Sequence, residues 1–492
     1  MNLKPYPEYK DSGVPWLGKV PRHWEVYKIR NVANLIVSNV DKHSFENENK
    51  VYLCNYTDVY KNEKITNKIK FMKATASEEE IRKFKLRIND VVITKDSESW
   101  NDIGVPALVL YENQDFICGY HLAILRTQEK LSGQYLFRLL QDKNTSAQFH
   151  IIANGVTRYG LSQNAIKDVK VLLPPISEQL AIARFLDYKT AQIARFIKAK
   201  KRMIELLKEQ KQVIINDAVT GKIVIKDEGG RLKAEKRPAS SFIPHPSSFL
   251  QTVPEGWEVR RLRTIATVKP SGVDKKSHEG ESPVQLCNYV DVYKNQEINS
   301  SLNFMKATAT EEEIKNFTLI PGDIVITKDS ETWKDIAVPA IVTENMNVVC
   351  AYHLALIRTT KEITSKYLYR AITADPIADH FRVSADGVTR FGLSQGAIKD
   401  AIIPVPTIEE QSQIVSYIET KTDALDLTIS RTEREIALIK EYRTRLISDV
   451  VTGKIDVRDI KIPDIADIDN TIDESIDEPE GEEESETAEG DE

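Results

Sequence analysis

The amino-acid sequence repeats itself once along its length, and this duplication restricts the possible folds more than any other feature. The segment FMKATASEEEI at residues 71–81 returns at residues 304–314 with one substitution, and GVTRYGLSQNAIKD at 155–168 returns at 387–400 with two. The period of 232 or 233 residues is much longer than that of a solenoid repeat. The chain is therefore predicted to contain two similarly folded halves, and its length also argues for several domains.

The first part of each copy has the pattern of a mixed domain. Short runs at residues 51–54, 90–94, 107–111 and 116–125 alternate apolar and polar residues between turn signals, as strands do. Between them, the sequence SEEE at residues 77–80 has the form of a helix N-terminal capping box. We expect a compact α+β domain of about 150 residues in each copy.

The second part of each copy has the pattern of a long helix. Pro174 and Pro175 cannot continue a preceding helix, but they suit the start of a new one, and Gly221 and Gly453 are placed to end the two helices. Some 40 residues at about 1.5 Å each correspond to a rod of roughly 60 Å. Apolar residues recur at coiled-coil-like spacing and form a predicted helix interface. They are Ile182, Leu186, Ile193, Ile197, Ile204 and Leu207 in the first copy, and Ile414, Ile418, Leu425, Ile436, Ile439 and Leu446 in the second.

A helix with one narrow apolar stripe needs a partner, and the other copy supplies one within the same chain. The predicted fold class is α+β, with two similar globular domains joined by two long antiparallel coiled-coil helices about a pseudo-twofold axis. The predicted segments are a first globular domain at 1–174, a first long helix at 175–221, a linker at 222–248, a second globular domain at 249–405, a second long helix at 406–453 and an acidic disordered tail at 454–492.

The charge of the chain is unevenly distributed. A net charge of −7 taken over the whole chain argues against nucleic acid as a partner. However, residues 461–492 are rich in Asp and Glu and contain one Lys, so the rest of the chain is net positive. The acidic tail is predicted either to aid solubility or to compete with DNA for the basic body of the chain.

Other classes of protein are disfavoured by simple patterns. No apolar run of 18 residues predicts a membrane helix, and the N-terminus lacks a signal-peptide core. None of the four cysteines, at positions 54, 118, 287 and 350, forms a C-x-x-C pair. They are interpreted as reduced, half-buried thiols of a cytoplasmic protein.

No catalytic group or metal site is predicted. Gly221 and Lys222 follow a helix instead of preceding one, which disfavours a phosphate-binding loop. The string from Asp90 to Lys95 resembles part of a nuclease core, but Ile93 stands where a second carboxylate is needed to hold Mg²⁺. His121 and its repeat have no second histidine at a kept spacing, so a structural role is favoured.

Two polar loops occur in both copies and are the candidate DNA-binding sites. Lys and Arg beside hydroxyl groups can hold phosphate oxygens, and Asn, Asp and Arg can address base edges. The alternative is a pair of solvated turns whose aromatic residues pack into the core. A basic face on the first helix is open to the same two interpretations, solvation or proximity to phosphates. The candidate DNA-binding residues are Lys95, Asp96, Ser97, Trp100, Asn154, Thr157, Arg158 and Tyr159 in the first copy, and Lys328, Asp329, Ser330, Trp333, Thr389, Arg390 and Phe391 in the second.

The order of these motifs resembles the specificity subunit of type I restriction–modification systems over residues 1 to about 460. The matching motifs are P-x-x-W-E at 21–25 and 254–258, G-V-T-R-Y/F-G-L-S at 155–162 and 387–394, P-P-x-x-E-Q at 174–179 with a variant at 406–411, and the two V-T-G-K-I segments. The resemblance implies that each globular domain is a target recognition domain reading one half of a bipartite DNA site. It also implies that the helices space these domains and dock partner subunits.

The resemblance further implies that the chain itself is not catalytic and binds no cofactor. Its implied partners are double-stranded DNA, two modification (methyltransferase) subunits and two restriction (translocase/nuclease) subunits, with no membrane. S-adenosylmethionine, ATP and Mg²⁺ would be used by those subunits for adenine methylation and DNA restriction. The rival interpretations are a DNA-binding regulator without a methyltransferase partner and a coiled-coil scaffold that binds protein alone.

The near-identity of the copies predicts something about the DNA target. A pseudo-twofold protein places equivalent residues on inverted half-sites, with centres about 34 Å apart or slightly more. The two half-sites are therefore expected to be the same or nearly the same. The copies differ most between residues 141–153 and 373–385, so the half-sites could differ at a position or two.

Overall fold

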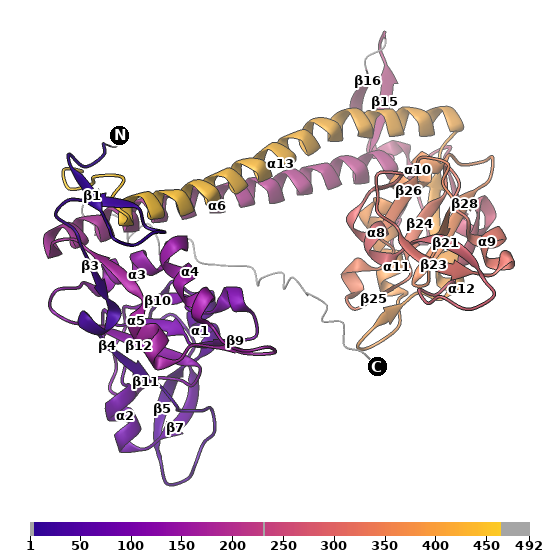
Figure 1. Cartoon of the computed structure of the whole chain (residues 1–492). Coiled ribbons are helices and arrows are strands. Elements are labelled where there is room, and N and C mark those ends of the chain that lie inside the picture. The colour runs from indigo at the N-terminus through magenta and orange to yellow at the C-terminus, as the bar shows by residue number, and fades with distance from the viewer. Residues whose placement is uncertain (1–3, 230–231, 464–492) are drawn as a thin grey trace. The chain divides into compact units, whose positions relative to one another are not determined.

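The computed structural model describes residues 4–229 and 232–463 and divides into two compact units. Unit 1 contains the chain up to Ala199 and from Glu435 onward, and unit 2 contains Lys200–Arg434. The sheets and most helices of the two units correspond in the same order, as the repeat predicts (Figure 1), but unit 2 has an additional hairpin of β15 (Ile223–Asp227) and β16 (Leu232–Lys236). The division passes through both long helices, so each unit holds one globular domain and one end of each helix.

The globular domain of unit 1 is built from short strands and short helices. Its strands are β1 (Tyr9–Asp11), β2 (Lys19–Pro21), β3 (Glu25–Lys28), β4 (Ala33–Val37), β5 (Asn49–Cys54), β6 (Lys64–Ile65), β7 (Met72–Ala76), β8 (Val91–Thr94), β9 (Asp96–Ser97), β10 (Pro106–Val109), β11 (Phe116–Cys118), β12 (Leu122–Thr127), β13 (Tyr159–Gly160) and β14 (Lys170–Leu173). Its helices are α1 (Tyr56–Lys61), α2 (Glu78–Phe84), α3 (Gly133–Leu140), α4 (Lys143–Ile152) and α5 (Gln163–Asp168), followed by the long helix α6 (Ile176–Val219).

A five-stranded sheet forms the centre of this domain. Its strand order is β4-β12-β8-β10-β6, and a three-stranded sheet of order β11-β5-β7 lies beside it in the fold. Strand β8 is the middle strand, and all four of its residues, Val91 to Ile93 and the polar Thr94, are buried. The SEEE segment forms the predicted capping box, in which Ser77 accepts from the Glu80 amide at the start of α2.

Unit 2 repeats this architecture. Its strands are β15 (Ile223–Asp227), β16 (Leu232–Lys236), β17 (Phe242–Pro244), β18 (Thr252–Pro254), β19 (Glu258–Arg261), β20 (Ala266–Pro270), β21 (Ser282–Cys287), β22 (Glu297–Ile298), β23 (Met305–Ala309), β24 (Ile324–Thr327), β25 (Asp329–Ser330), β26 (Pro339–Val342), β27 (Val348–Cys350), β28 (Leu354–Thr359), β29 (Phe391–Gly392) and β30 (Ile402–Val405). Its helices are α7 (Leu262–Ile265), α8 (Tyr289–Lys294), α9 (Glu311–Phe317), α10 (Ser365–Thr373), α11 (Asp375–Val383) and α12 (Gln395–Lys399), followed by the long helix α13 (Ile408–Val451).

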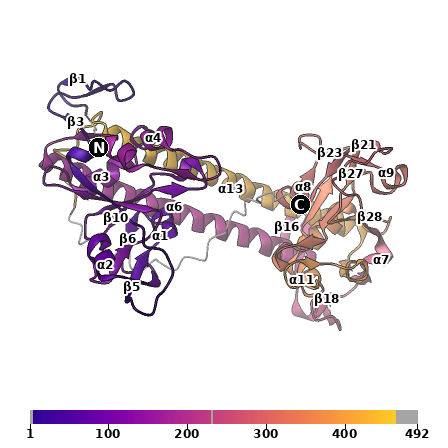
Figure 2. The same ribbon diagram turned by 60° about the horizontal axis from the view of Figure 1, so that its bottom comes forward.

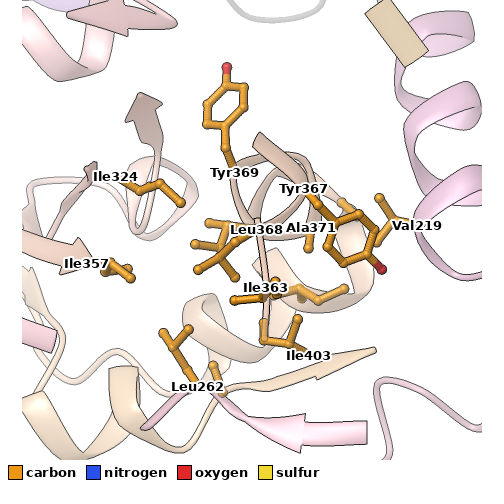
Figure 3. Close-up of a cluster of buried hydrophobic side chains, with 14 of the residues drawn as sticks. Val219, Leu262, Ile324, Ile357, Ile363, Tyr367, Leu368, Tyr369, Ala371 and Ile403 are labelled. Carbon is orange, nitrogen blue, oxygen red and sulfur yellow. The ribbon is translucent and has the colours of Figure 1, made fainter. Parts of the chain in front are cut away.

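The sheets of unit 2 have the equivalent strand orders, β20-β28-β24-β26-β22 and β23-β21-β27. Figure 2 shows the three strands of the smaller sheet side by side. The core packs α10 against the larger sheet, and Figure 3 shows Leu368 of α10 among side chains that include Ile324 and Ile357. Val219, at the end of α6, belongs to the same buried cluster.

The two long helices run antiparallel within each unit. In unit 1 the start of α6, with Ile182 and Leu186, shares a buried cluster with Leu446 and Val450 near the end of α13. In unit 2 the end of α6 shares a cluster with the start of α13, including Ile418. The two helices therefore exchange roles between the units, and each globular domain packs on the start of one helix and the end of the other.

The repeated motifs at the ends of the helices join domain and helix. Trp24 of the P-x-x-W-E motif donates its indole N–H to Glu178 of α6 at 2.9 Å, and both side chains are buried. The adjacent Gln179 is fully buried and donates to the Pro174 carbonyl at 2.8 Å, while its own carbonyl accepts from the Ser132 amide at 2.8 Å. Gln179 thereby pairs the amide at the start of α3 and the carbonyl just before α6, and so links the domain to the long helix.

The V-T-G-K-I motif at the end of α13 packs at the same junction between the domain and α6 in unit 1. A Cβ added at Gly453 would stand 2.4 Å from Pro21 and 3.2 Å from Trp24, so only glycine allows this approach. In unit 2 the equivalent Gly221 meets Pro254 and Trp257 in the same way.

Three details of the sequence prediction need correction. The predicted linker, residues 222–248, contains the hairpin β15–β16 and strand β17 instead of irregular chain alone. The beginning of the predicted disordered tail is packed, with Val457 buried and the Asp456 amide bonded to the Lys4 carbonyl. The rest of the tail, residues 464–492, lies outside the described residues.

The third correction concerns the cysteines, which are fully buried instead of half-buried. They are free thiols. Cys54 and Cys118 face each other across the parallel strands β5 and β11. Burial raises the pKa of both thiols, which makes them poor nucleophiles.

Replacing the buried Leu186 by alanine is expected to lower the free energy of unfolding by about 2–5 kcal/mol, because it leaves a cavity between helix and domain. The matched control is Leu206→Ala on the same helix, where the side chain is 50% exposed and little change is expected. Denaturant unfolding of the full chain measures both. Equal losses would contradict the assigned faces of α6.

Candidate nucleic-acid interface

The structure brings the two candidate loops of each copy together. In unit 1, strand β9 pairs with β13, so that Ser97 lies opposite Tyr159 and Asp96 opposite Gly160. In unit 2, β25 pairs with β29 in the same register, with Ser330 opposite Phe391. Figure 1 labels one strand of each pair, β9 and β25, near the edge of its domain. Segments some 60 residues apart in sequence thus form one surface in each unit.

A chain of polar contacts links the two loops in unit 1. Lys95 forms an ion pair with the carboxylate of Asp96, which also bonds His121 Nδ1 at 3.0 Å. On the other side of the ring, Arg158 Nη2 donates to His121 Nε2 at 2.9 Å. The ring stands beside Tyr120, with centroids 3.9 Å apart. We call Lys95, Asp96, His121 and Arg158 the polar chain.

Unit 2 contains the same polar chain. Asp329 pairs with Lys328 and bonds His353 Nδ1 at 2.8 Å, and Arg390 Nη2 donates to His353 Nε2 at 3.1 Å. The His353 ring lies 3.9 Å from Tyr352 between centroids. The recurrence of every contact indicates that the local sequence specifies the arrangement.

The carboxylate at the centre of the polar chain is held in its charged form. Burial raises the pKa of Asp96, but hydrogen bonds from Lys95 and His121 outweigh this effect, and its pKa lies below the ordinary value. The same balance lowers the pKa of Asp329. Asp96 is therefore engaged within the protein, which leaves Arg158 as the cation exposed to a ligand.

The G-V-T-R loop is a tight hairpin with an exposed apolar tip. Asn154 and Gly160 exchange both backbone hydrogen bonds, at 3.1 and 2.9 Å. Gly155 has φ of 149°, and an added Cβ would stand 1.9 Å from the Arg158 carbonyl oxygen. At the tip, the side chain of Val156 is 90% exposed. An exposed valine beside an arginine suits contact with a base, for example a thymine methyl group.

A tryptophan begins the short turn that follows β9 in unit 1 and β25 in unit 2. Trp100 is half exposed and meets His150 edge to face, with centroids 5.6 Å apart. Trp333 is similarly exposed, but the cation of Lys334 lies over its ring at 6.0 Å instead. The predicted alternative of an aromatic tucked into the core is therefore wrong for both tryptophans.

The remaining predicted residues divide between exposed and supporting positions. Thr157 and Thr389 are exposed in the hairpins, whereas Tyr159 and Phe391 are half-buried. Ser97 is buried and bonds the hydroxyl of Tyr56 at 3.1 Å, and Ser330 makes the same contact with Tyr289. The buried serines shape the loops and are poorly placed to touch a ligand themselves.

Sequence reasoning missed several residues of this surface. His121 was singled out by its repeat but assigned a structural role, and Tyr120, Tyr56 and Val156 were not selected. The signal for all four is present, because each recurs at the equivalent position of the second copy. Their proximity is the part that a one-dimensional pattern does not show.

The structure also argues against a nuclease site at the string from Asp90 to Lys95. Asp90 is buried and forms two bonds with Arg126, at 2.9 and 2.7 Å. Asp323 and Arg358 repeat this pair at 2.7 Å for both bonds. A carboxylate engaged in this way is a structural ion pair. Among residues 4–229 and 232–463, no three His, Cys, Asp or Glu side chains form a group suited to a metal ion.

The twelve residues predicted as a helix interface lie mostly inside the chain. Eight are buried, namely Ile182, Leu186, Ile193, Ile204, Ile414, Ile418, Ile436 and Leu446. Four are half-buried, namely Ile197, Leu207, Leu425 and Ile439. A partner protein would therefore meet other side chains. On the predicted basic face, Arg202 is exposed and paired with Glu205 at 2.9 Å, which favours a solvated face at that position. Lys211 is instead largely buried and paired with Asp426 of the other long helix at 2.7 Å.

Other apolar side chains of the long helices are exposed at equivalent positions of the two copies. Ile176 and Ile408, at the helix starts, are 46% and 45% exposed. Leu206 and Leu438, further along, are 50% and 65% exposed. Large exposed apolar side chains repeated on both helices mark a candidate protein-binding surface.

Comparison with known proteins agrees with this architecture. A model described as the type I restriction modification DNA specificity domain matches residues 21–213 and 254–438, which is one match in each copy and most of the chain. The chain belongs to this family. As a type I specificity subunit, it has the two-domain α+β fold predicted from its repeat.

Individual relatives are distant in sequence. The Escherichia coli type I restriction enzyme EcoBI specificity subunit is 23% identical over 308 residues, covering 61% of this chain and 62% of the relative. A putative type I restriction enzyme MjaX specificity subunit from Methanocaldococcus jannaschii is 22% identical, over 90% of this chain and 96% of the relative. A solved chain from work on complex assembly and conformational transition of the type I R-M system aligns with a TM-score of 0.63 at 14% identity, covering 88% of this chain and 99% of that chain. At that identity the last match supports the fold alone.

In the described part of the chain, every helix is too short or too polar to cross a bilayer.

Proposed function

We propose that this chain is the non-catalytic, DNA-reading subunit of a type I restriction–modification complex. Each unit would read one half of a bipartite target with its polar chain and hairpin, and the long helices would dock modification and restriction subunits. S-adenosylmethionine, ATP and Mg²⁺ would be used by those partners for adenine methylation and DNA restriction. The observation that carries the proposal is the presence of the same exposed two-loop surface in both units of a specificity subunit.

The chemistry of this surface suits double-stranded DNA. Arg158 and Arg390 present guanidinium groups that can contact phosphates or guanine edges. Asn154, with an amide that can pair with adenine, stands beside the exposed Val156. The exposed Trp100 adds an aromatic surface at the border. These groups provide the polar, cationic and apolar contacts that sequence reading requires.

The similarity of the two surfaces supports near-identical, inverted half-sites. The hairpins differ at two positions, where Asn154 is replaced by Asp386 and Tyr159 by Phe391. Asn154 and Asp386 are both exposed, whereas Tyr159 and Phe391 are half-buried. Asn suits adenine and Asp suits cytosine, so position 154/386 is where the half-sites are expected to differ.

The exposed leucines support docking of equivalent partners. Leu206 and Leu438 occupy the same position on the two helices, one in each unit. Their repetition fits two copies of one partner, since equivalent surfaces bind equivalent proteins. We assign these leucines and the helix-start isoleucines to modification-subunit docking.

Replacing Arg158 or Arg390 by alanine is expected to weaken DNA binding. If the arginine contacts a phosphate, affinity falls on all sequences and the slope of log affinity against log salt decreases by about 1. If it reads a base, the loss is confined to the target sequence. Anisotropy titrations at several salt concentrations separate the two cases, with Lys233→Ala, exposed on β16, as control. Unchanged binding of both arginine variants at low and high salt would remove them from the interface.

Mapping of N6-methyladenine on DNA treated with the complex is expected to reveal an interrupted target with inverted, nearly identical half-sites. Their centres should lie about 34 Å apart or slightly more. An Asn154→Asp variant should make the halves more alike if this position reads a base. Two unrelated half-sites would refute the proposed symmetry, while still agreeing with a specificity subunit.

Leu206→Asp and Leu438→Asp are each expected to remove one modification subunit, and the double variant both, because each buries a charge in an apolar contact. The measurement is the mass of the co-purified complex. Lys201→Asp, which places the same residue on another side of α6, is the control. Two subunits retained on the double variant would contradict the assignment, and DNA binding with no partner at all would favour a stand-alone regulator.

A further inference from the structure

We propose that His121 and His353 are positioning residues that aim the arginines of the adjacent hairpins at DNA. Each histidine accepts a hydrogen bond from its arginine and thereby fixes the direction of the guanidinium before the duplex arrives. The inference rests on the proposed DNA-reading function and adds to it a residue that does not itself touch DNA.

The partners of the His121 ring determine its protonation pattern. A carboxylate with a lowered pKa can only accept, so His121 Nδ1, at 3.0 Å from Asp96, carries the ring proton. A guanidinium can only donate, so Nε2 meets Arg158 Nη2 at 2.9 Å with its lone pair. The ring is therefore a neutral imidazole that connects a half-buried anion to an exposed cation.

The backbone holds the ring in an unusual conformation. His121 has φ of 72° and His353 has the same value, in the left-handed region that non-glycine residues seldom adopt. The His121 carbonyl accepts from the Lys95 amide at 2.7 Å, and the Asp96 amide lies at 3.4 Å. A strained residue that is tied to the candidate loop in both copies points to a functional arrangement.

The arginine has one protein partner in this arrangement. In the described part of the chain, the hydrogen bond of the Arg158 guanidinium is to His121 Nε2, and Nη2 also lies 3.4 Å from Nδ1. Its other N–H groups are left to a ligand. A long side chain that is already oriented loses less conformational freedom on binding, so the histidine raises affinity without a contact of its own.

A double-mutant cycle tests this role, and the repeat provides the control. His121→Asn suits a positive φ but has no Nε2 to receive the arginine. Duplex binding is measured by anisotropy with the full chain in its complex, for His121→Asn, Arg158→Ala and the pair. We expect a loss of about tenfold for Arg158→Ala and about 3- to 10-fold for His121→Asn. The double variant should have the same DNA affinity as Arg158→Ala alone, because without the arginine the histidine has no side chain to position.

When His121→Asn is combined with Arg390→Ala of the other unit, the two fold-losses of DNA affinity should instead multiply. His353→Asn with Arg390→Ala repeats the test independently, and melting temperatures identify a variant that fails to fold. His121→Asn should also flatten the salt dependence if Arg158→Ala does, which a purely structural residue would not.

The results that would contradict the positioning role differ from the result that would contradict the proposed function. Multiplying losses within one unit would overturn the positioning role and leave DNA reading intact. An Arg158→Ala variant that binds as well as wild type would overturn it too, since the arginine would not contact DNA. Failure of the unaltered complex to bind any duplex would instead refute the proposed function.

Discussion

The structure depends on a paired carboxylate at the start of each long helix, which is buried in unit 1 and half-buried in unit 2. Glu178 accepts from Trp24 at 2.9 Å and from His23 at 2.8 Å, and it also bonds the hydroxyl of Tyr6. In unit 2, Glu410 accepts from Trp257 and pairs with Arg237, both at 3.1 Å. A buried charge is tolerated only with such partners, so the helix cannot leave the domain without exposing unpaired groups. The same two tryptophans also pack closely against the glycines that end the other long helix, Gly453 against Trp24 and Gly221 against Trp257. Each domain is thereby fixed to both helices.

This arrangement separates the proposed DNA surface from three of the four motifs that carry the family resemblance. The P-x-x-W-E, P-P-x-x-E-Q and V-T-G-K-I motifs all lie at the junction of domain and helix. Three members of the polar chain, Lys95, Asp96 and Arg158, lie in the two segments that follow β8 and precede α5, and His121 lies just before β12. Exposed loops on a rigid sheet are well suited to reading variable ligands. Asn154 and Asp386 show that such a position can change while the hairpin around it is kept.

The fold was largely predictable, because a long duplication and a 3.6-residue apolar period are visible in one dimension. The long helices lie where their proline starts and glycine ends indicated. The candidate site was predictable in its two loops, and Lys95, Asp96 and Arg158 do meet. Their connection through His121 was not, because the ring is brought between them by strand β12, from outside both loops. The apolar stripe was predicted as the interface between the two long helices, and eight of its twelve residues are buried.

The sequence by itself determined that this chain has two equivalent halves, where their helices run, and which polar loops recur. These properties follow from local patterns, since capping, periodicity and glycine conformation act over a few residues. The tertiary structure decided which residues act together. It buried Ser97 and Asp90 in structural bonds, exposed Trp100 and Val156, and joined Arg158 to a carboxylate through a histidine. Such contacts span dozens of residues, and their strength depends on burial and direction, which exist only once the sheets have formed.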